Sequence, residues 1–288
     1  MENISIVGGD ARNIELAKIY AKYKKVYTFG LEQSEETYNT ENVIKCKSLD
    51  EAMENSNLIV TAIPISKDKI TINTPYSKEN ILIEEVLKKA NNKMIITGKL
   101  PEELIEKYSN RKIVDLLERE DFAILNALPT AEGTIKIIIE NIYMNISNSN
   151  ILIIGFGRIG KVLADRLKKL NANVYVSARK NEDFAWMHVL GYNPVKYKQL
   201  NEKLPKFDII INTVPYLIID GSKLELVKKN CLLIELASLP GGIDEKSTKL
   251  KELKLINAQG LPGKISKVAA AKIIEETIKN IIEEMKEK

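Results

Sequence analysis

Cysteine and histidine are scarce in this chain, and their scarcity excludes several kinds of chemistry. The 288 residues include 2 Cys and 1 His. Cys46 and Cys231 lie far apart in strand-like runs, which indicates reduced thiols of a cytosolic protein rather than a disulfide framework. The sequence shows no cluster of metal-ligand residues, so we expect no metal site. His188 lies in a helical stretch outside every motif, which disfavours a Ser-His-Asp hydrolase and a dehydrogenase with a catalytic His–acid pair.

Long apolar runs and blocks of one charge are also missing. No stretch of about 18 apolar residues occurs, so the sequence predicts no transmembrane helix. Residues 1–7 lead straight into a strand, and no secretory signal is expected. The 43 basic and 39 acidic residues are interspersed, which gives nucleic-acid binding little support. We therefore expect a cytoplasmic protein with neither a membrane nor a nucleic-acid partner. Its oligomeric state, a homo-oligomer included, stays open.

A glycine fingerprint follows an apolar strand near the middle of the chain. Residues 150–154 are the strand, Gly155, Gly157 and Gly160 form the fingerprint, and a helical pattern begins at Lys161. The first glycine permits a tight turn, the second lets the backbone approach a pyrophosphate, and the third lets the helix pack on the strand. The pyrophosphate would bind free N–H groups at the positive end of that helix. The pattern therefore predicts a dinucleotide site.

The end of the next strand indicates which dinucleotide is bound. NAD enzymes place an Asp or Glu on the ribose hydroxyls roughly 20 residues past the fingerprint. This chain has Ser177, Arg179 and Lys180 there, and these groups would attract a 2′-phosphate rather than repel it. We therefore predict NADP as the cofactor. The alternative is that Arg179 and Lys180 only form a solvated turn.

Strand-like and helical patterns alternate along the whole chain, which is long enough for two domains. The expected strands are 4–7, 26–29, 58–63, 93–97, 112–118 and 123–126 in the first half, and 150–154, 174–177, 208–212, 232–236 and 255–258 in the second. Turn residues 129–133 open a helix expected from Thr134 to about Ile146.

This alternation predicts an α/β fold of two doubly wound parallel-sheet domains, of which the second is a Rossmann NADP-binding domain. Residues 1–130 would form an N-terminal substrate and catalytic domain, and residues 131–265 the cofactor domain. The last segment, 266–288, is an amphipathic helix that we expect to return to the first domain and complete it.

Ligands of doubly wound sheets bind beyond the carboxyl ends of the strands, where the second half carries polar and glycine-rich loops. We expect residues 212–215 to run along the nicotinamide ribose and the loop at Ser238 to permit close backbone approach. The alternative is that the Gly and Pro residues of these loops only make turns. The predicted cofactor-binding residues are Gly155, Phe156, Gly157, Arg158, Ile159, Gly160, Ser177, Arg179, Lys180, Asn212, Thr213, Val214, Pro215 and Ser238.

The first half lacks a comparable fingerprint. Gly8-Gly9-Asp10 has no third glycine and is a poor nucleotide signal. The helix N-terminus that follows, with Arg12 nearby, could hold a carboxylate instead. For Arg119 the alternative to ligand binding is an exposed ion pair with Glu118 or Asp121.

Several of these motifs together resemble one family. The residues that carry the resemblance are 7–12, 64–66, 118–119, 126, 129–130, 132–134, 155–160, 178–179, 212–215, 236–238, 240–242, 244 and 260–263. In this order they resemble the A subunits of dipicolinate synthase along nearly the whole chain. One departure is Leu239, which stands where a basic residue is expected.

The resemblance implies a function. Family members oxidise dihydrodipicolinate, or its precursor 4-hydroxy-tetrahydrodipicolinate, to dipicolinate (pyridine-2,6-dicarboxylate) with NADP⁺. They work with a flavoprotein-like B subunit in the mother cell of a sporulating bacterium. A substrate with two carboxylates needs two anion sites, for which we expect Arg12 or Ser66 at one, and Arg119, Asn126 or Thr130 at the other. Asn126 and Thr130 join Glu132 as the candidate catalytic residues.

Glu132 is the candidate base or water-orienting group, provided that it is partly buried. Its alternative is a helix-start carboxylate that meets the helix dipole. Two alternatives for the whole chain also stay open. The first is a non-catalytic NADP-binding regulatory or scaffold protein whose partner performs the chemistry. The second is another two-domain NADP reductase, of the kind that resembles shikimate dehydrogenase.

Overall fold

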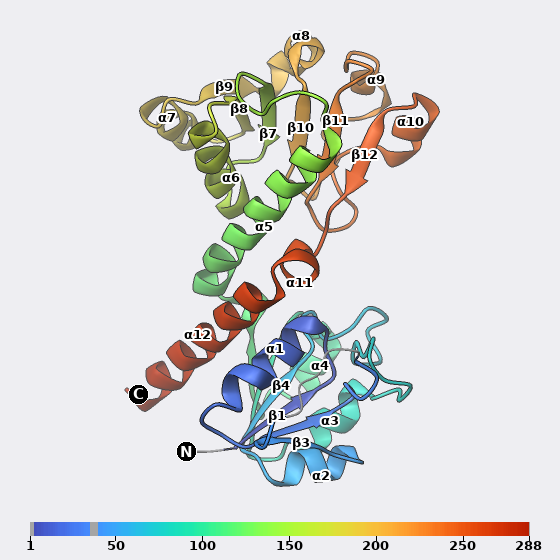
Figure 1. Ribbon diagram of the computed structural model, residues 1–288, viewed down its shortest axis with the longest axis vertical. Helices are drawn as coiled ribbons and strands as arrows, with labels where there is room; N and C mark the ends of the chain where they lie inside the picture. Colours follow the sequence, from blue (N-terminus) through green and yellow to red (C-terminus); the bar gives the residue numbers. More distant parts are fainter. Residues whose placement is uncertain (1–2, 35–39, 288) are drawn as a thin grey trace. The chain divides into compact units, whose positions relative to one another are not determined.

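The computed structural model describes residues 3–34 and 40–287, and it divides the chain into two compact units (Figure 1). Unit 1 comprises Met1–Asn126 and Pro262–Lys288, and unit 2 comprises Ala127–Leu261. The boundaries predicted from the sequence lie after residues 130 and 265. Both divisions assign the C-terminal segment to the first unit.

Unit 1 is built on a six-stranded sheet whose strands all run parallel, in the order β3-β2-β1-β4-β5-β6. Its strands are β1 (Ile4–Val7), β2 (Val26–Phe29), β3 (Val43–Lys45), β4 (Leu58–Thr61), β5 (Met94–Thr97) and β6 (Lys112–Asp115). Its helices are α1 (Ala11–Tyr20), α2 (Leu49–Glu54), α3 (Ile83–Lys89), α4 (Glu102–Lys107), the 3₁₀ turn η1 (Leu116–Glu118) and α12 (Lys267–Lys286).

Unit 2 repeats this topology, with the strand order β12-β11-β10-β7-β8-β9 and parallel pairing throughout. Its strands are β7 (Asn150–Ile154), β8 (Asn173–Ala178), β9 (Asn193–Lys196), β10 (Ile209–Asn212), β11 (Leu232–Glu235) and β12 (Lys254–Asn257). Its helices are α6 (Arg158–Lys169), α7 (Asn181–Val189), α8 (Leu200–Lys203), α9 (Gly221–Leu224) and α10 (Glu245–Leu250), with 3₁₀ turns η2 (Tyr197–Gln199) and η3 (Leu204–Lys206). The predicted fold class is confirmed.

The segments that join the units differ from the prediction. Helix α5 (Glu120–Asn141) begins in unit 1 and continues into unit 2, and α11 (Leu261–Ile265) leads back. Residues 123–126, predicted as a strand, lie in α5, and this helix begins 14 residues before Thr134 and ends before Ile146. The short apolar run before Pro129 was predicted as a strand, because a proline disfavours helical backbone at the residue that precedes it. Burial of Phe122, Ala127 and Ala131 outweighs that local preference.

Helix α5 is also long and apolar enough, by length and composition, to cross a membrane, which the sequence pattern did not lead us to expect. About half of the qualifying window, 44%, is buried inside the protein. A core helix of a soluble protein passes the same test, so this observation is weak support for a membrane span.

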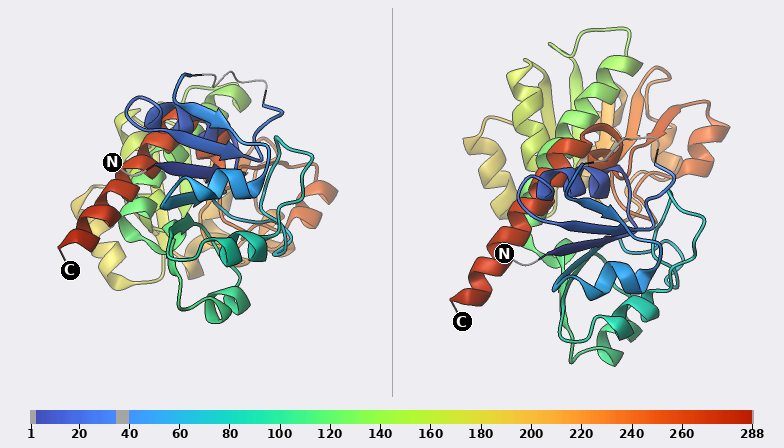
Figure 2. Two further views of the ribbon diagram at one scale, coloured as in Figure 1. Left: turned by 90° about the horizontal axis from the view of Figure 1, so that it is seen from below. Right: turned by 60° about the horizontal axis from the view of Figure 1, so that its bottom comes forward.

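The C-terminal helix is part of the core of unit 1. Figures 1 and 2 show α12 alongside α1 in different views, and the two helices pack directly on each other. Ile274, Ile278 and Ile281 of α12 are buried in one cluster with Ile14 and Leu16 of α1. These side chains bury the apolar stripe that the sequence pattern showed, so the amphipathic tail completes unit 1 as expected.

We expect Ile278→Ala to destabilise unit 1 by about 2–5 kcal/mol, because it removes buried methyl groups and leaves a cavity. Ile278 is fully buried, whereas Val268 on the same helix is 46% exposed, so Val268→Ala is the matched control and should cost under about 0.5 kcal/mol. Urea denaturation followed by far-UV circular dichroism measures both. Equal, small losses would show that α12 does not belong to the core.

Candidate functional site

The turn between β7 and α6 has the geometry that the glycine fingerprint predicts. Gly155 has φ +101°, a left-handed conformation in which a side chain would be strained, and a Cβ there would lie 2.3 Å from the Thr213 Oγ1. A Cβ at Gly160 would lie 2.2 Å from the carbonyl oxygen of Gly155. Both positions therefore require glycine, the first for the turn and the second for the packing of α6 against it.

Gly157 is different, because the space around it is open. It is the N-cap of α6, and apart from its chain neighbours and the adjoining helix backbone no heavy atom of the described residues lies within 4 Å of the place where its Cβ would be. No side chain of the described residues caps this helix, and its first turn contains no acid. An uncapped helix N-terminus offers N–H groups and a partial positive charge to an anion. The residues present thus fit the pyrophosphate of a dinucleotide.

The equivalent turn of unit 1 is filled by the protein itself. Asp10 is the N-cap of α1, and its carboxylate accepts hydrogen bonds from the Arg12 backbone N–H at 3.0 Å and from its Nε at 2.9 Å. The loop after β4 returns across the glycines, where the Gly9 N–H donates to the Asn73 carbonyl at 2.8 Å. A Cβ at Gly8 would lie 2.7 Å from Ile72. This helix N-terminus therefore already holds a carboxylate, that of Asp10.

Arg12, predicted to bind substrate, is engaged in this arrangement. Its Nη2 donates to Asp10 at 2.8 Å and also to the carbonyl of Ile63. Gly263 of α11 lies against the pair, and a Cβ there would be 3.0 Å from the Arg12 Nε. A substrate carboxylate would have to replace Asp10 as the partner of this guanidinium.

At the carboxyl end of β8, the three predicted phosphate ligands lie in different surroundings. Ser177 is fully buried, and its hydroxyl has no hydrogen-bond partner among the described residues. Lys180 is exposed, but its ammonium lies 3.0 Å from Glu182, which raises the Lys180 pKa. Arg179 is exposed, and no hydrogen bond or ion pair of its side chain is found in the described part of the chain. Of the three, Arg179 is the cation available to a ligand.

The end of β10 is organised by a residue that the sequence motifs did not reveal. Glu235, at the end of β11, is 3% exposed, and its carboxylate accepts hydrogen bonds from four N–H groups. The donors are the Asn212 Nδ2 at 2.7 Å and the backbone N–H groups of Ala237, Gly242 and Ile243 at 2.9, 2.7 and 3.1 Å. Asn212 is fully buried and committed to this network, rather than facing the nicotinamide ribose as predicted. An acid inside an apolar strand, followed by a glycine-rich loop, was the available signal.

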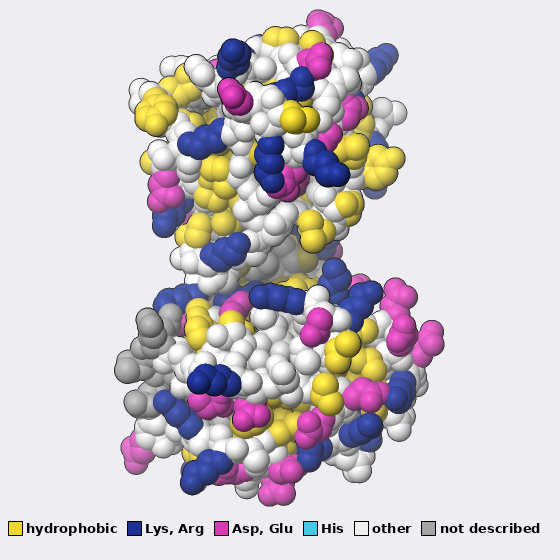
Figure 3. Space-filling model, turned by 90° about the vertical axis from the view of Figure 1, so that its right-hand side faces the viewer, with side chains coloured by type: hydrophobic (Ala, Val, Ile, Leu, Met, Phe, Trp, Pro, Cys, Tyr) yellow, Lys and Arg dark blue, Asp and Glu magenta, His cyan; other side chains and the backbone are white. Residues whose placement is uncertain are grey.

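The remaining predicted cofactor residues of this edge are accessible. Thr213 and Val214 are half-buried, and Pro215 and Ser238 are exposed. The Thr213 Oγ1 donates to the carbonyl of Ile154 at 2.9 Å, which joins this loop to the end of β7. Glu235, Leu239 and Gln259 help to line an open hollow of about 720 Å³ in unit 2. On the face drawn in Figure 3, Lys and Arg alternate with Asp and Glu.

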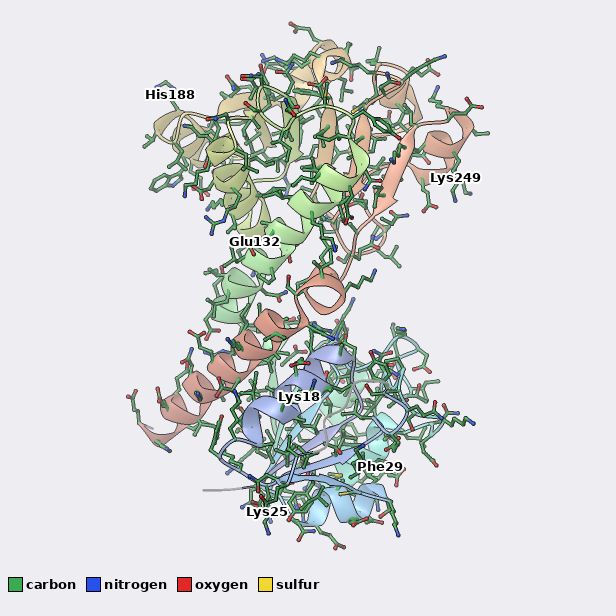
Figure 4. All side chains as sticks on the ribbon, in the orientation of Figure 1. Lys18, Lys25, Phe29, Glu132, His188 and Lys249 are labelled. Carbon is green, nitrogen blue, oxygen red and sulfur yellow. The ribbon has the colours of Figure 1, made fainter. Side chains whose placement is uncertain are left out.

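The structure does not bring the three predicted catalytic residues together. All lie on α5, where Asn126 and Thr130 are one turn apart and share a face, whereas Glu132 is about 200° further around the axis than Thr130. Thr130 is buried and Asn126 half-buried, but Glu132 is exposed (Figure 4). Glu132 therefore does not meet the condition of partial burial under which it was a candidate base.

Arg119 and Ser66 also have partners within unit 1. The guanidinium of Arg119 donates to Asp121 at 2.9 Å and to Glu284 of α12 at 2.7 and 2.9 Å. Arg119 lowers the pKa of Asp121 to about 2. Ser66 is half-buried, and its Oγ donates to the exposed Asp68 at 2.8 Å. For Arg119 the structure favours the alternative of an ion pair, with Asp121 as one expected partner.

His188 is exposed on α7 (Figure 4). Within residues 3–34 and 40–287, no group of three or more His, Cys, Asp and Glu side chains is placed to hold a metal ion. Cys46 and Cys231 are both buried and unbridged, and burial raises the Cys231 pKa to about 12. Reactive thiolate chemistry is therefore not supported at Cys231.

Two family models match the chain. The N-terminal domain of the dipicolinate synthase A subunit matches residues 3–117, and the NAD-binding domain of D-isomer-specific 2-hydroxyacid dehydrogenases matches residues 139–243. The second match covers the glycine fingerprint and the ends of β8, β10 and β11. The chain thus carries a nicotinamide-dinucleotide-binding domain of the dehydrogenase kind, and an oxidoreductase role is supported.

Whole-length relatives agree with these matches. The chain is 29% identical to the dipicolinate synthase A subunit of Bacillus subtilis, over 98% of this chain and 96% of that one. Crystal structures of the Bacillus halodurans and Bacillus subtilis A subunits each superpose with a TM-score of 0.86 at 29% identity. They cover 97% and 99% of this chain, and 97% of each known chain. The chain is therefore similar to the dipicolinate synthase A subunits along almost its whole length.

Proposed function

We propose that this chain is the catalytic A subunit of a dipicolinate synthase. It oxidises dihydrodipicolinate, or the hydrated precursor 4-hydroxy-tetrahydrodipicolinate, with NADP⁺, in complex with a flavoprotein-like B subunit. Its place is the cytoplasm of the mother cell of a sporulating bacterium. The observation that carries the proposal is the open N-terminus of α6 in a chain that matches the known A subunits along its full length.

The cofactor domain supplies most of the binding groups from its backbone. The pyrophosphate is held at residues 155–160, where Gly157 leaves the approach open. The loops at Thr213–Pro215 and Ser238 lie along the nicotinamide ribose. When bound, the cofactor supplies a hydride acceptor, and the protein supplies position and a path for one proton.

The charge at the end of β8 supports NADP rather than NAD. Arg179 is exposed there, and no acid occupies the position at which NAD enzymes bind the ribose hydroxyls. A guanidinium forms charge-assisted hydrogen bonds with a phosphate, which is the difference between the two dinucleotides.

For the substrate we propose Asn126 and Thr130 as one polar pair, because they share a face of α5. Arg12 is the proposed partner of a substrate carboxylate, by exchange with Asp10. In the oxidation of the dihydro compound, one hydride leaves the ring and one proton is released, and the ring becomes aromatic. Glu132 is too exposed to be the proton acceptor. The proton is therefore taken up by water or by a less exposed group.

We expect the chain together with its B partner to form dipicolinate from NADP⁺ and freshly made aldol product of pyruvate and aspartate semialdehyde. NADPH absorbance and the ultraviolet bands of a pyridine dicarboxylate should grow in step. The same assay without the B partner shows whether the chain is active by itself or only in the complex. If both signals stay absent with the partner present while the cofactor still binds, the chain is a regulatory or scaffold protein instead.

Arg179→Asp should weaken NADP⁺ binding by about 1–3 kcal/mol, because a charged hydrogen bond is lost, and should leave NAD⁺ binding nearly unchanged. Titration calorimetry with both cofactors measures the two effects. Lys180→Asp is the matched control, since Lys180 is already paired with Glu182. Equal weakening of NADP⁺ and NAD⁺ by Arg179→Asp would refute the role of this residue.

Arg119→Gln should leave the KM for the dicarboxylate substrate unchanged and reduce stability at neutral pH by under about 1 kcal/mol. The ion pair depresses the Asp121 pKa from its ordinary value of about 3.9 to about 2. Its stabilisation is therefore full above the ordinary value and is lost as the pH falls through about 2. Acid unfolding of both proteins should thus converge at the lowest pH. A tenfold rise in KM would instead place Arg119 on the substrate.

A further inference from the structure

The proposed phosphate site at the end of β8 holds fewer free cations than the sequence suggests. Lys180 is paired with Glu182 at 3.0 Å, and Ser177 is fully buried. Arg179 alone remains, whereas a phosphate monoester at neutral pH carries nearly two negative charges and three acceptor oxygens. A single guanidinium leaves part of this charge and at least one oxygen without a protein partner. A second cation near Arg179 would bind the remaining charge and oxygen of such a phosphate.

The parallel register of the sheet places a second cationic residue, Lys196, next to the end of β8. On the neighbouring strand β9, Lys196 pairs in register with Ala178, the residue directly before Arg179. Adjacent strands lie about 4.8 Å apart, so the two cationic residues begin from neighbouring points at the carboxyl edge of the sheet. Ligands of this fold bind at that edge.

The local structure fixes the backbone of Lys196. Its N–H donates to the Gln199 Oε1 at 3.1 Å, which holds the turn from β9 into η2. The ammonium lies 5.9 Å from the centre of the Phe184 ring on α7, close enough for a weak cation–π contact. Lys196 is exposed, and within the described residues its side chain forms no salt bridge.

Arg179 and the turn at Lys196 are also within electrostatic reach of each other. Burial raises the pKa of the Tyr197 phenol, and the positive charge of Arg179 partly offsets this rise. The Arg179 charge therefore acts on the phenol of the residue that directly follows Lys196. Two like charges at neighbouring positions favour a shared anion.

We propose that Lys196 is the second cationic ligand of the cofactor's 2′-phosphate and that Lys196 and Arg179 together determine the preference for NADP over NAD. This proposal rests on the proposed function, because it assumes that unit 2 binds a phosphorylated dinucleotide. It assigns to η2 and the end of β9 a part in specificity that the fingerprint motif does not contain.

The test compares dissociation constants of NADP⁺, NAD⁺ and adenosine 2′,5′-bisphosphate for the full chain. Lys196→Gln should weaken NADP⁺ and the bisphosphate about tenfold, as expected for one lost charged hydrogen bond, and should change NAD⁺ binding less than twofold. Lys196→Arg should keep most of the affinity. Lys229→Gln is the charge-matched control. Lys229 is exposed and precedes β11, so it lies at the amino ends of the strands, whereas the proposed site lies at their carboxyl ends.

Three results would overturn the proposal: no change in NADP⁺ binding by Lys196→Gln, equal weakening of NADP⁺ and NAD⁺, or an equal loss in Lys229→Gln. Thermal melting of each variant separates a lost ligand from a lost fold. The binding assay needs neither substrate nor the B partner. Failure to form dipicolinate would therefore refute the proposed function and leave the role of Lys196 unaffected. Conversely, unchanged NADP⁺ binding by Lys196→Gln would refute the role of Lys196 and leave the proposed function unaffected.

Discussion

The proposed function of this chain depends on one uncapped helix N-terminus, that of α6. Helix α6 begins at Gly157 without a side-chain cap and without an acid in its first turn, and the position is open to an approaching anion. Gly155 and Gly160 make that geometry sterically possible, because a Cβ at either would meet an atom closer than 2.5 Å. The N–H groups and the helix dipole then provide an anion site built from backbone alone.

The two sheets show that topology does not decide which half binds the cofactor. Both have six parallel strands in the same order, and both have glycines after the first strand. In unit 1 the Asp10 carboxylate caps α1, and the loop through Asn73 bonds to the Gly9 N–H, so the anion position is taken by the protein's own groups. The same fold thus carries an internal carboxylate at the helix start in one half and an uncapped, open helix start in the other.

Local sequence was sufficient where the structural requirement is local. The fingerprint glycines, ten of the twelve strands in the described residues and the amphipathic tail were predictable, because a turn, a hydrophobic period or an apolar stripe depends on a few neighbouring residues. The short strands β3 and β9 were missed. Roles that depend on distant partners were not predictable. Asn212 was expected to face the cofactor, but Glu235 binds it from the next strand, and Arg119 is held by Glu284, 165 residues away. The run before Pro129 was predicted as a strand. It is helical because its side chains are buried against distant parts of the chain, which local sequence does not show.

The most direct test of this account is a crystal structure of the chain with NADP⁺. We expect density for the pyrophosphate against the backbone of Gly157, with the adenosine 2′-phosphate beside Arg179. Pyrophosphate density at the Gly8–Gly9 turn of unit 1, or an α6 N-terminus left empty at saturating cofactor, would contradict it.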